Sequence, residues 1–174
     1  KDLGLDGTET PDHLNADENL KLRLESIRLK AGKAMGLGDV SAKAVPKICL
    51  ASKPINGGTI NTHTFIPKQS HKAIGVLGAV SVGTAALFKG SIINRLASLP
   101  NNQKIDTTMR QMIIEHPSGN LTFELELSND SAQPRVERVG LVRTTRMLCR
   151  GEVYVPKSVW DGKRDKAYAS IKPI

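Results

Sequence analysis

One glycine-rich apolar segment constrains the fold of this chain more than any other feature. Residues 70–86 read SHKAIGVLGAVSVGTAA, and no charged side chain follows Lys72 within them. A helix on a protein surface carries a polar face, so a helix that is apolar all round is expected to be enclosed by other elements. Its small residues allow neighbouring backbones to approach closely: Gly75, Gly78, Ala79 and Gly83. We therefore expect a central helix with the rest of the domain wrapped around it.

The start of this helix is a candidate anion site. Ser70 can serve as the N-cap, and His71 and Lys72 then fall in the first turn, where free backbone N–H groups and the helix dipole favour a negative charge. The alternative is an ordinary capping serine followed by two solvated polar residues. Capping statistics alone favour that alternative, so a binding role needs support from elsewhere in the sequence.

A second helix and a hairpin are predicted before this segment. Residues 15–35 carry a helical stripe of apolar residues and run into Gly36. The stripe consists of Leu20, Leu24, Ile27, Ala31 and Ala34. Residues 44–52 and 59–67 are rich in strand formers, and the sequence Asn-Gly-Gly between them is a strong turn signal. This pattern predicts an amphipathic helix followed by a β-hairpin.

The second half of the chain also reads as strands. Residues 108–115 and 121–127 flank the sequence His-Pro-Ser-Gly-Asn, whose Pro and Gly suit a tight turn, so a second hairpin is predicted. Residues 136–155 favour two strands joined at an irregular bend, and the alternative is a helix over residues 137–148. Helices and hairpins together indicate an α+β domain.

The charge balance indicates an anionic partner. The chain has 174 residues, which fits one domain, and its 25 Lys and Arg against 17 Asp and Glu give a net charge of +8. Only 3% of the residues are aromatic and the bases are scattered, so platforms that stack unpaired bases are largely missing. We therefore expect a small acid rather than nucleic acid as the partner.

The remaining patterns argue against several other classes of protein. Cys49 and Cys149 are predicted to be free buried thiols, which indicates a reducing compartment such as the cytoplasm. No apolar run is long enough to span a membrane, and the first residues are polar and acidic rather than a signal peptide. The four histidines are dispersed without ligand spacing, so no metal site is predicted.

Five stretches of the chain resemble the PrpF family of isomerases, which act on small unsaturated polycarboxylates such as 2-methylaconitate and aconitate. They read AGKAMGLGD, VPKI, SHKAIGVLGAV, HPSG and RTTRMLCRGEVYVP, and they follow one another in the order that the family has. The resemblance runs from roughly residue 19 to residue 156. This stretch is similar to the C-terminal half of a family member. A whole family member is about twice as long as this chain.

The resemblance implies a diaminopimelate-epimerase-like fold. In that fold each of two similar domains is a β-barrel-like sheet around a central helix, and the active site lies in the cleft between them. Residues 1–17 are then a linker from a missing N-terminal domain, residues 18–156 are the C-terminal domain, and residues 157–174 are a polar tail. The missing domain of the same protein becomes an expected partner, with a homodimer as a further possibility.

The resemblance also implies a function: cofactor-independent proton transfer that isomerises an unsaturated di- or tricarboxylate. The family's usual acid-base lysine and cysteine belong to the half that is absent, so this chain alone should be inactive. The alternative is a non-catalytic anion-binding module of the same fold. The expected substrate-binding residues are Ser70, His71, Lys72, Lys47, His116 and Ser118.

Two of these assignments, and the role of two arginines, have competing interpretations. Lys47 can bind a carboxylate or be a solvated residue at a strand start. His116 and Ser118 can lie near substrate, but we favour the turn itself as the reason for the Pro-Ser-Gly sequence. Arg143 and Arg146 can clamp a polycarboxylate, although we favour a structural role in ion pairs with Glu124, Glu126 or Glu152.

Overall fold

The computed structural model describes residues 2–99, 109–128 and 135–160. The chain divides into two compact units, residues 1–142 and residues 143–174. All of the helices and strands of the described residues belong to the first unit. No helix in the described part of the chain is long and apolar enough to cross a membrane.

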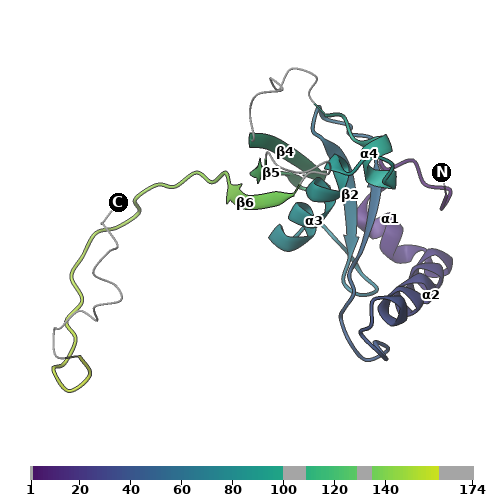
Figure 1. The fold of residues 1–174 in the computed structure, drawn as a ribbon. Coiled ribbons are helices and arrows are strands. Elements are labelled where there is room, and N and C mark those ends of the chain that lie inside the picture. Colours follow the sequence, from purple (N-terminus) through teal and green to yellow (C-terminus); the bar gives the residue numbers. More distant parts are fainter. Residues whose placement is uncertain (1, 100–108, 129–134, 161–174) are drawn as a thin grey trace. The chain divides into compact units, whose positions relative to one another are not determined.

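The first unit is built on a mixed six-stranded sheet with helices on both faces (Figure 1). Its strands are β1 Ile48–Ser52, β2 Ile60–Phe65, β3 Ser70–His71, β4 Met109–His116, β5 Gly119–Leu127 and β6 Val136–Leu141. The order across the sheet is β1-β2-β4-β5-β6, with β3 paired to β2. Among the strand pairings of the described residues, only that of β2 with β4 is parallel. The predicted α+β class is confirmed at this level.

Both predicted hairpins are confirmed. β1 and β2 pair antiparallel, with Cys49 opposite Thr64, and β4 and β5 pair antiparallel, with Met112 opposite Phe123. Gly119 closes the β4–β5 turn at φ 141°, a backbone conformation that residues with a side chain rarely adopt. The turn residues read from the sequence therefore mark the true ends of these strands.

The glycine-rich helix starts later than its sequence predicts. Helix α3 spans Val76–Leu87 with Gly75 as its N-cap, whereas Ser70 and His71 form β3 against the end of β2. The prediction that Ser70 caps this helix is wrong. Asn15 holds Ser70 instead, because its Oδ1 accepts the Ser70 N–H at 2.6 Å and its Nδ2 donates to the Ser70 carbonyl at 3.2 Å. A tertiary partner outweighs the local capping preference here.

Helix α3 packs one face on the sheet. Ala79, Val82, Gly83 and Ala86 are buried in a cluster that includes Met112 and Phe123. On the opposite side Leu77 is 83% exposed, so within the described residues the helix is not enclosed all round. The short helix α4 (Ile92–Leu96) contributes partly buried side chains to the same cluster.

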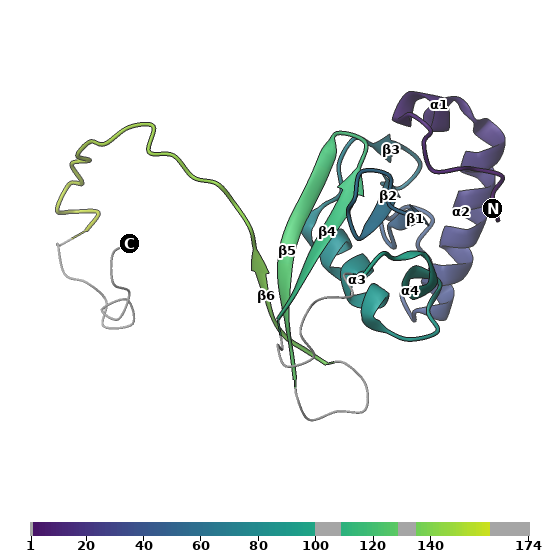
Figure 2. The ribbon, with the colours of Figure 1, turned by 90° about the horizontal axis from the view of Figure 1, so that it is seen from above.

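The other face of the sheet carries the N-terminal helices (Figure 2). Helix α1 (Pro11–Ala16) and helix α2 (Glu18–Ala34) form a second apolar cluster with Phe65 of β2. The segment 1–17, expected as a linker, thus contains α1 and contributes the buried Leu14 to this cluster. β1 serves both clusters, because Cys49 and Ala51 face one and Ile48 and Leu50 face the other.

The buried stripe of α2 differs from the predicted one. Leu20 and Leu24 are buried as expected, but Ile27 is 46% exposed and the fully buried Arg28 takes its place, followed by Gly32. A Cβ on Gly32 would lie 2.5 Å from Val40, so the loop after the helix packs directly on its backbone at this position. Close packing of that loop rotates the buried face away from Ile27.

Residues 136–155 contain one strand where two were predicted. β6 ends at Leu141, and residues 142–155 form neither a strand nor the alternative helix. Arg143, Arg146 and Cys149 are exposed, which corrects the prediction that Cys149 is buried. Glu126, one expected partner of these arginines, pairs with Arg138 at 2.8 Å. Most of the predicted tail, from residue 161 onward, lies outside the described residues.

Candidate functional site

The strand register brings the predicted site segments to one end of the sheet. β2 and β4 run parallel with Asn61 opposite Glu115, so both strands end on the same side, and His116 closes β4 there. β3 pairs with Thr64 and Phe65 at the same end of β2. Lys47 immediately precedes Ile48, which is opposite Phe65. The N-terminus of α3 follows β3 after four residues of chain.

Direct hydrogen bonds join two of these segments. The Lys72 carbonyl accepts from the backbone N–H of Ser118 at 2.9 Å and from its Oγ at 2.7 Å. The same Oγ lies 3.2 Å from His116 Nδ1. The structure therefore fixes the HPSG turn against the SHK segment, 46 residues earlier in the chain. The predicted turn role of HPSG is confirmed, and a role near substrate stays a prediction.

Ser70 carries an unsatisfied polar atom at this end of the sheet. The residue is only 7% exposed, and its Oγ is buried without a hydrogen-bond partner in the described part of the structure. Leaving a buried hydroxyl unpaired costs free energy, and most buried polar atoms have a partner. The Ser70 hydroxyl therefore has unused hydrogen-bonding capacity at this end of the sheet.

Charge and backbone donors lie next to this hydroxyl in the chain. His71 and Lys72 are exposed, so the imidazole and the ammonium group are accessible to a ligand. Gly75 at the N-cap of α3 makes no side-chain capping hydrogen bond. A helix N-terminus that lacks a capping side chain offers backbone N–H groups and a positive dipole end to an anion.

The loop before Lys47 is held by a buried arginine that the sequence analysis missed. Nη1 of Arg28 donates to the carbonyls of Lys43 and Val45 at 3.0 and 2.8 Å, and Nη2 donates to the Val40 carbonyl at 2.9 Å. Glu25 accepts from Nε at 2.8 Å and from Nη2 at 2.9 Å. The spacing of Glu25 and Arg28 by three residues was the available signal.

Ion pairing and hydrogen bonding keep both groups charged. The hydrogen bond from Arg28 lowers the pKa of Glu25, and the same bond raises the pKa of Arg28 despite its burial. Lys47 itself is exposed at the end of this loop. Arg28 thus fixes the backbone immediately before the cation without contacting that cation.

Comparison with known proteins identifies the family. The model of the PrpF family, described as PrpF protein, matches residues 1–156. The chain belongs to the PrpF family. The curated relatives of this PrpF chain include the 4-oxalomesaconate tautomerase of Pseudomonas putida, which is 46% identical over 162 residues, covering 93% of this chain and 42% of that protein.

More distant relatives are also isomerases. The 3-methylitaconate isomerase of Eubacterium barkeri is 30% identical over 177 residues, covering 91% of this chain and 44% of that protein. A crystal structure of methylitaconate-delta-isomerase superposes with a TM-score of 0.62 at 22% sequence identity, covering 81% of this chain and 42% of that one. The PrpF chain therefore spans about two fifths of the length of these relatives.

One buried acidic group of the PrpF chain was not expected from the sequence. Glu115 is 3% exposed, and its carboxylate accepts from the N–H groups of Ile55, Asn56 and Gly58 at 2.7 to 2.8 Å. These bonds tie the β1–β2 turn to β4. An acidic residue inside a strand pattern was a signal, but its partners are backbone groups that sequence spacing cannot identify.

The partly buried Cys49 is a poor nucleophile at neutral pH. Burial raises the pKa of its thiol to about 11, although hydrogen bonds from Thr64 and Thr62 oppose the shift. Nucleophilic attack needs the thiolate, which is scarce at neutral pH when the pKa is this high. Among the described residues, no group of three or more His, Cys, Asp or Glu side chains could hold a metal ion.

Proposed function

We propose that this chain is one part of a cofactor-independent isomerase of small unsaturated di- or tricarboxylates. The observation that carries the proposal is the buried, unpaired Ser70 hydroxyl, at the sheet end that also holds Lys72 and the Ser118 turn. The names of the relatives support the class of substrate, since they include oxalomesaconate, methylitaconate and methylaconitate. Each of these substrates is an unsaturated polycarboxylate.

The proposed chemistry is a proton transfer next to a carboxylate. A base removes a proton from the carbon alpha to a carboxylate, and an acid returns a proton at the allylic carbon or after rotation about the intervening bond. Negative charge then develops on the carboxylate oxygens, where cations and fixed N–H donors stabilise it. We assign the stabilisation of this negative charge to Lys72, with a hydrogen bond donated by the Ser70 hydroxyl. The other residues proposed to contact the substrate are His71, Lys47, His116 and Ser118.

The acid and the base are assigned to the part of the protein that the longer relatives have and this chain lacks. We propose a diaminopimelate-epimerase-like arrangement, in which residues 18–156 form one of two domains around a cleft and residues 157–174 form a tail. The mixed sheet with α3 packed on one face is compatible with this arrangement. A non-catalytic module of the same fold that binds an anion is the competing function.

A chimera tests the proposal. The part of the Pseudomonas putida tautomerase that lies outside the aligned region is joined to this chain, and the isomerisation of oxalomesaconate, methylitaconate and aconitate is followed by absorbance. Turnover is expected for at least one of them. A folded chimera that retains a tricarboxylate but turns over none of the three would support the non-catalytic module and overturn the catalytic role.

A charge-removing variant then tests the site within the active chimera. Lys72→Met removes a charge-assisted contact, which contributes on the order of 1.5 to 3 kcal/mol, so kcat/KM should fall by about tenfold to a hundredfold. Lys30→Met removes the same charge from an exposed position of α2 and should leave kcat/KM unchanged. Equal effects of the two substitutions would show that only the overall charge matters and that the site is wrongly placed.

A further inference from the structure

The outer edge of β1 is unpaired in the described part of the chain. β1 is the terminal strand of the sheet, and its pairing partner β2 occupies one edge only. The edge of a strand presents backbone N–H and C=O groups that can pair with a further strand. Because β1 spans five residues, a partner strand of similar length would match it.

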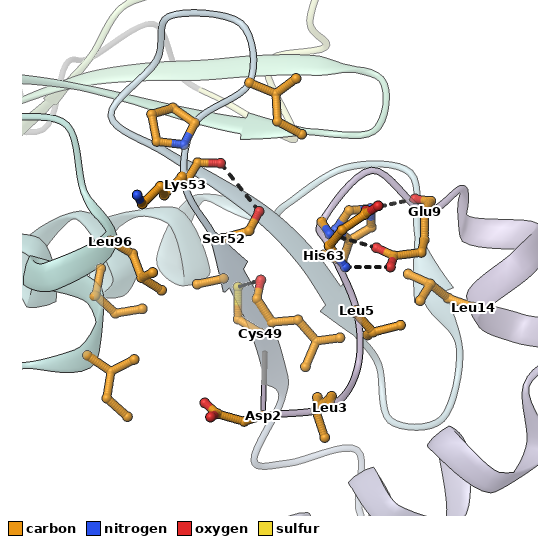
Figure 3. Close-up of a pocket in the computed structure, with 18 of the residues that line it drawn as sticks. Asp2, Leu3, Leu5, Glu9, Leu14, Cys49, Ser52, Lys53, His63 and Leu96 are labelled. Atoms are coloured by element: carbon orange, nitrogen blue, oxygen red, sulfur yellow. Dashed lines mark hydrogen bonds between the residues drawn. The ribbon is translucent and has the colours of Figure 1, made fainter.

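A cavity of about 850 Å³ follows this edge (Figure 3). Successive residues of β1 line it although they face opposite sides of the sheet: Cys49 and Ala51 belong to the cluster under α3, and Leu50 belongs to the cluster under α2. A cavity confined to one face would contact alternate residues only. This cavity therefore borders the outer edge of β1, where the next strand would continue the sheet, and it also extends over the α2 side of the sheet to His63 of β2 and Leu14 of α1.

The walls of the cavity have the form of a slot for a strand. Leu3 and Leu5 of the N-terminal segment form one wall and pack with the cluster under α2. Ile92, Ile93 and Leu96 form the other wall on α4. A strand placed between these walls would direct alternate side chains to each of them, and both walls are apolar.

The rim is polar and carries both signs of charge. Asp2, Asp6 and Glu9 lie on the N-terminal side, and Lys53 and Arg95 lie on the other. A pocket for a small acid would gather cations around one point, whereas here opposite charges line the entrance. The polar rim and apolar floor instead match the anatomy of a protein interface.

We propose that an extended apolar strand, from the part of the PrpF protein that the longer relatives have and this chain lacks, fills this slot by pairing with β1. The relatives supply the occupant, because this chain covers only 42% of the 4-oxalomesaconate tautomerase. The inference rests on the proposed function only in treating the chain as part of a longer protein. It adds a surface distinct from the sheet end that holds Ser70 and Lys72.

Amide hydrogen exchange tests the proposed pairing directly. The chimera of this chain with the remaining part of the Pseudomonas putida tautomerase is compared with this chain alone, and exchange is followed in peptides covering residues 48–52. Pairing should slow exchange of the outward β1 amides at least tenfold. Unchanged exchange in a folded chimera overturns the proposal. Slow exchange in this chain alone, together with a dimer in sedimentation, also overturns it, because the occupant is then a second copy.

A matched pair of variants locates the contact. Ile92 lines the slot and is 60% exposed, so Ile92→Lys should disturb the incoming strand without opening a core and should restore fast exchange of β1 in the chimera. Leu22→Lys introduces the same charge at an exposed position of α2 outside the slot and should leave β1 protected. If the β1 amides remain protected in both variants, the strand does not lie between the proposed walls.

The exchange result is independent of catalysis. A chimera with protected β1 amides and no turnover supports the strand proposal and contradicts the proposed function. An active chimera whose β1 amides exchange as fast as those of the chain alone supports the proposed function and contradicts the strand proposal. The two proposals therefore fail on different measurements.

Discussion

Single buried polar residues hold the loops of this protein in place. Arg28 ties three loop carbonyls to α2, and Glu115 ties three N–H groups of the β1–β2 turn to β4. Each charged group replaces the water that these backbone atoms would lose on burial. Removing one partner of such an arrangement leaves the others unsatisfied, and the cost is larger than that of a surface contact.

Glu115→Gln tests the cost of removing a buried charged partner at the β1–β2 turn. The amide keeps the shape of the side chain but loses its charge and turns one acceptor into a donor that faces N–H groups. Hydrogen bonds to charged groups contribute about 1.5 to 3 kcal/mol each, so unfolding in urea should show a loss of about 2 to 4 kcal/mol. Glu18→Gln, at an exposed ion pair with Lys21, should cost less than about 1 kcal/mol. Similar losses for both variants would contradict the assigned role.

Cys49 makes a prediction about alkaline pH. Its folded pKa of about 11 lies above the value of about 8.5 for a free cysteine, so the folded protein holds this proton more tightly than the unfolded chain does. That contribution to stability is fully present below about pH 8.5 and is lost as the pH rises towards 11. The unfolding free energy of the parent minus that of Cys49→Ser should therefore decline over this window, by on the order of 3 kcal/mol. A constant difference would show that the thiol is not desolvated.

At the scale of elements, the contact between α3 and the sheet depends on small side chains. Ala79, Gly83 and Ala86 are buried against strands that carry Met112 and Phe123. Helix and sheet can approach closely only where no bulky atom separates them. The glycines of this segment are thus partly a packing feature, as the sequence pattern indicated.

Gly83→Ala measures how close this approach is. A Cβ at this position would meet Phe123 Cζ at 2.5 Å, and overpacking of this kind costs about 1 to 3 kcal/mol, offset by up to about 1 kcal/mol from the higher helix propensity of alanine. We expect a net loss of about 1 to 2 kcal/mol in chemical denaturation. Gly78→Ala meets Ile74 at 3.3 Å and should lie between no change and a gain of about 1 kcal/mol. Equal gains for both variants would mean that the sheet yields freely.

At the scale of the whole molecule, stability resides in the first unit. Both apolar clusters consist of residues between Leu3 and Val136, and the second unit begins at Arg143. In the second unit, exposed apolar residues include Met147, Leu148, Val153 and Tyr154. Among the described residues, both apolar clusters therefore lie before residue 143, and we expect them to drive folding.

Truncation after Val142 tests this division. The shortened chain should unfold in one cooperative transition, with a melting temperature within about 3 °C of the full chain, because no member of either cluster is removed. Circular dichroism and calorimetry provide the measurement. A broad transition or a fall of more than about 10 °C, equivalent to roughly 2.5 to 5 kcal/mol for a domain of this size, would place essential packing beyond Val142.

Much of the local structure was predictable from the sequence. Asn56-Gly57-Gly58 and the HPSG turn identified both hairpins, and the leucine spacing identified α2, because turn chemistry and periodicity act over a few residues. The quoted motifs also identified the family, which the match over residues 1–156 confirms. These features depend on near neighbours in the chain, so sequence patterns are sufficient to find them.

Only the tertiary structure decided the features that depend on distant partners. Serine is a typical N-cap residue, yet Ser70 lies in a strand. It pairs with Phe65, and its backbone N–H and carbonyl both hydrogen-bond to the side chain of Asn15. Ile27 fits the helical stripe, yet three carbonyls from a later loop bury Arg28 instead. The contact between Lys72 and Ser118 joins segments 46 residues apart. Long-range pairing overrides these local preferences because each is worth less than about 2 kcal/mol, whereas unpaired buried groups cost more.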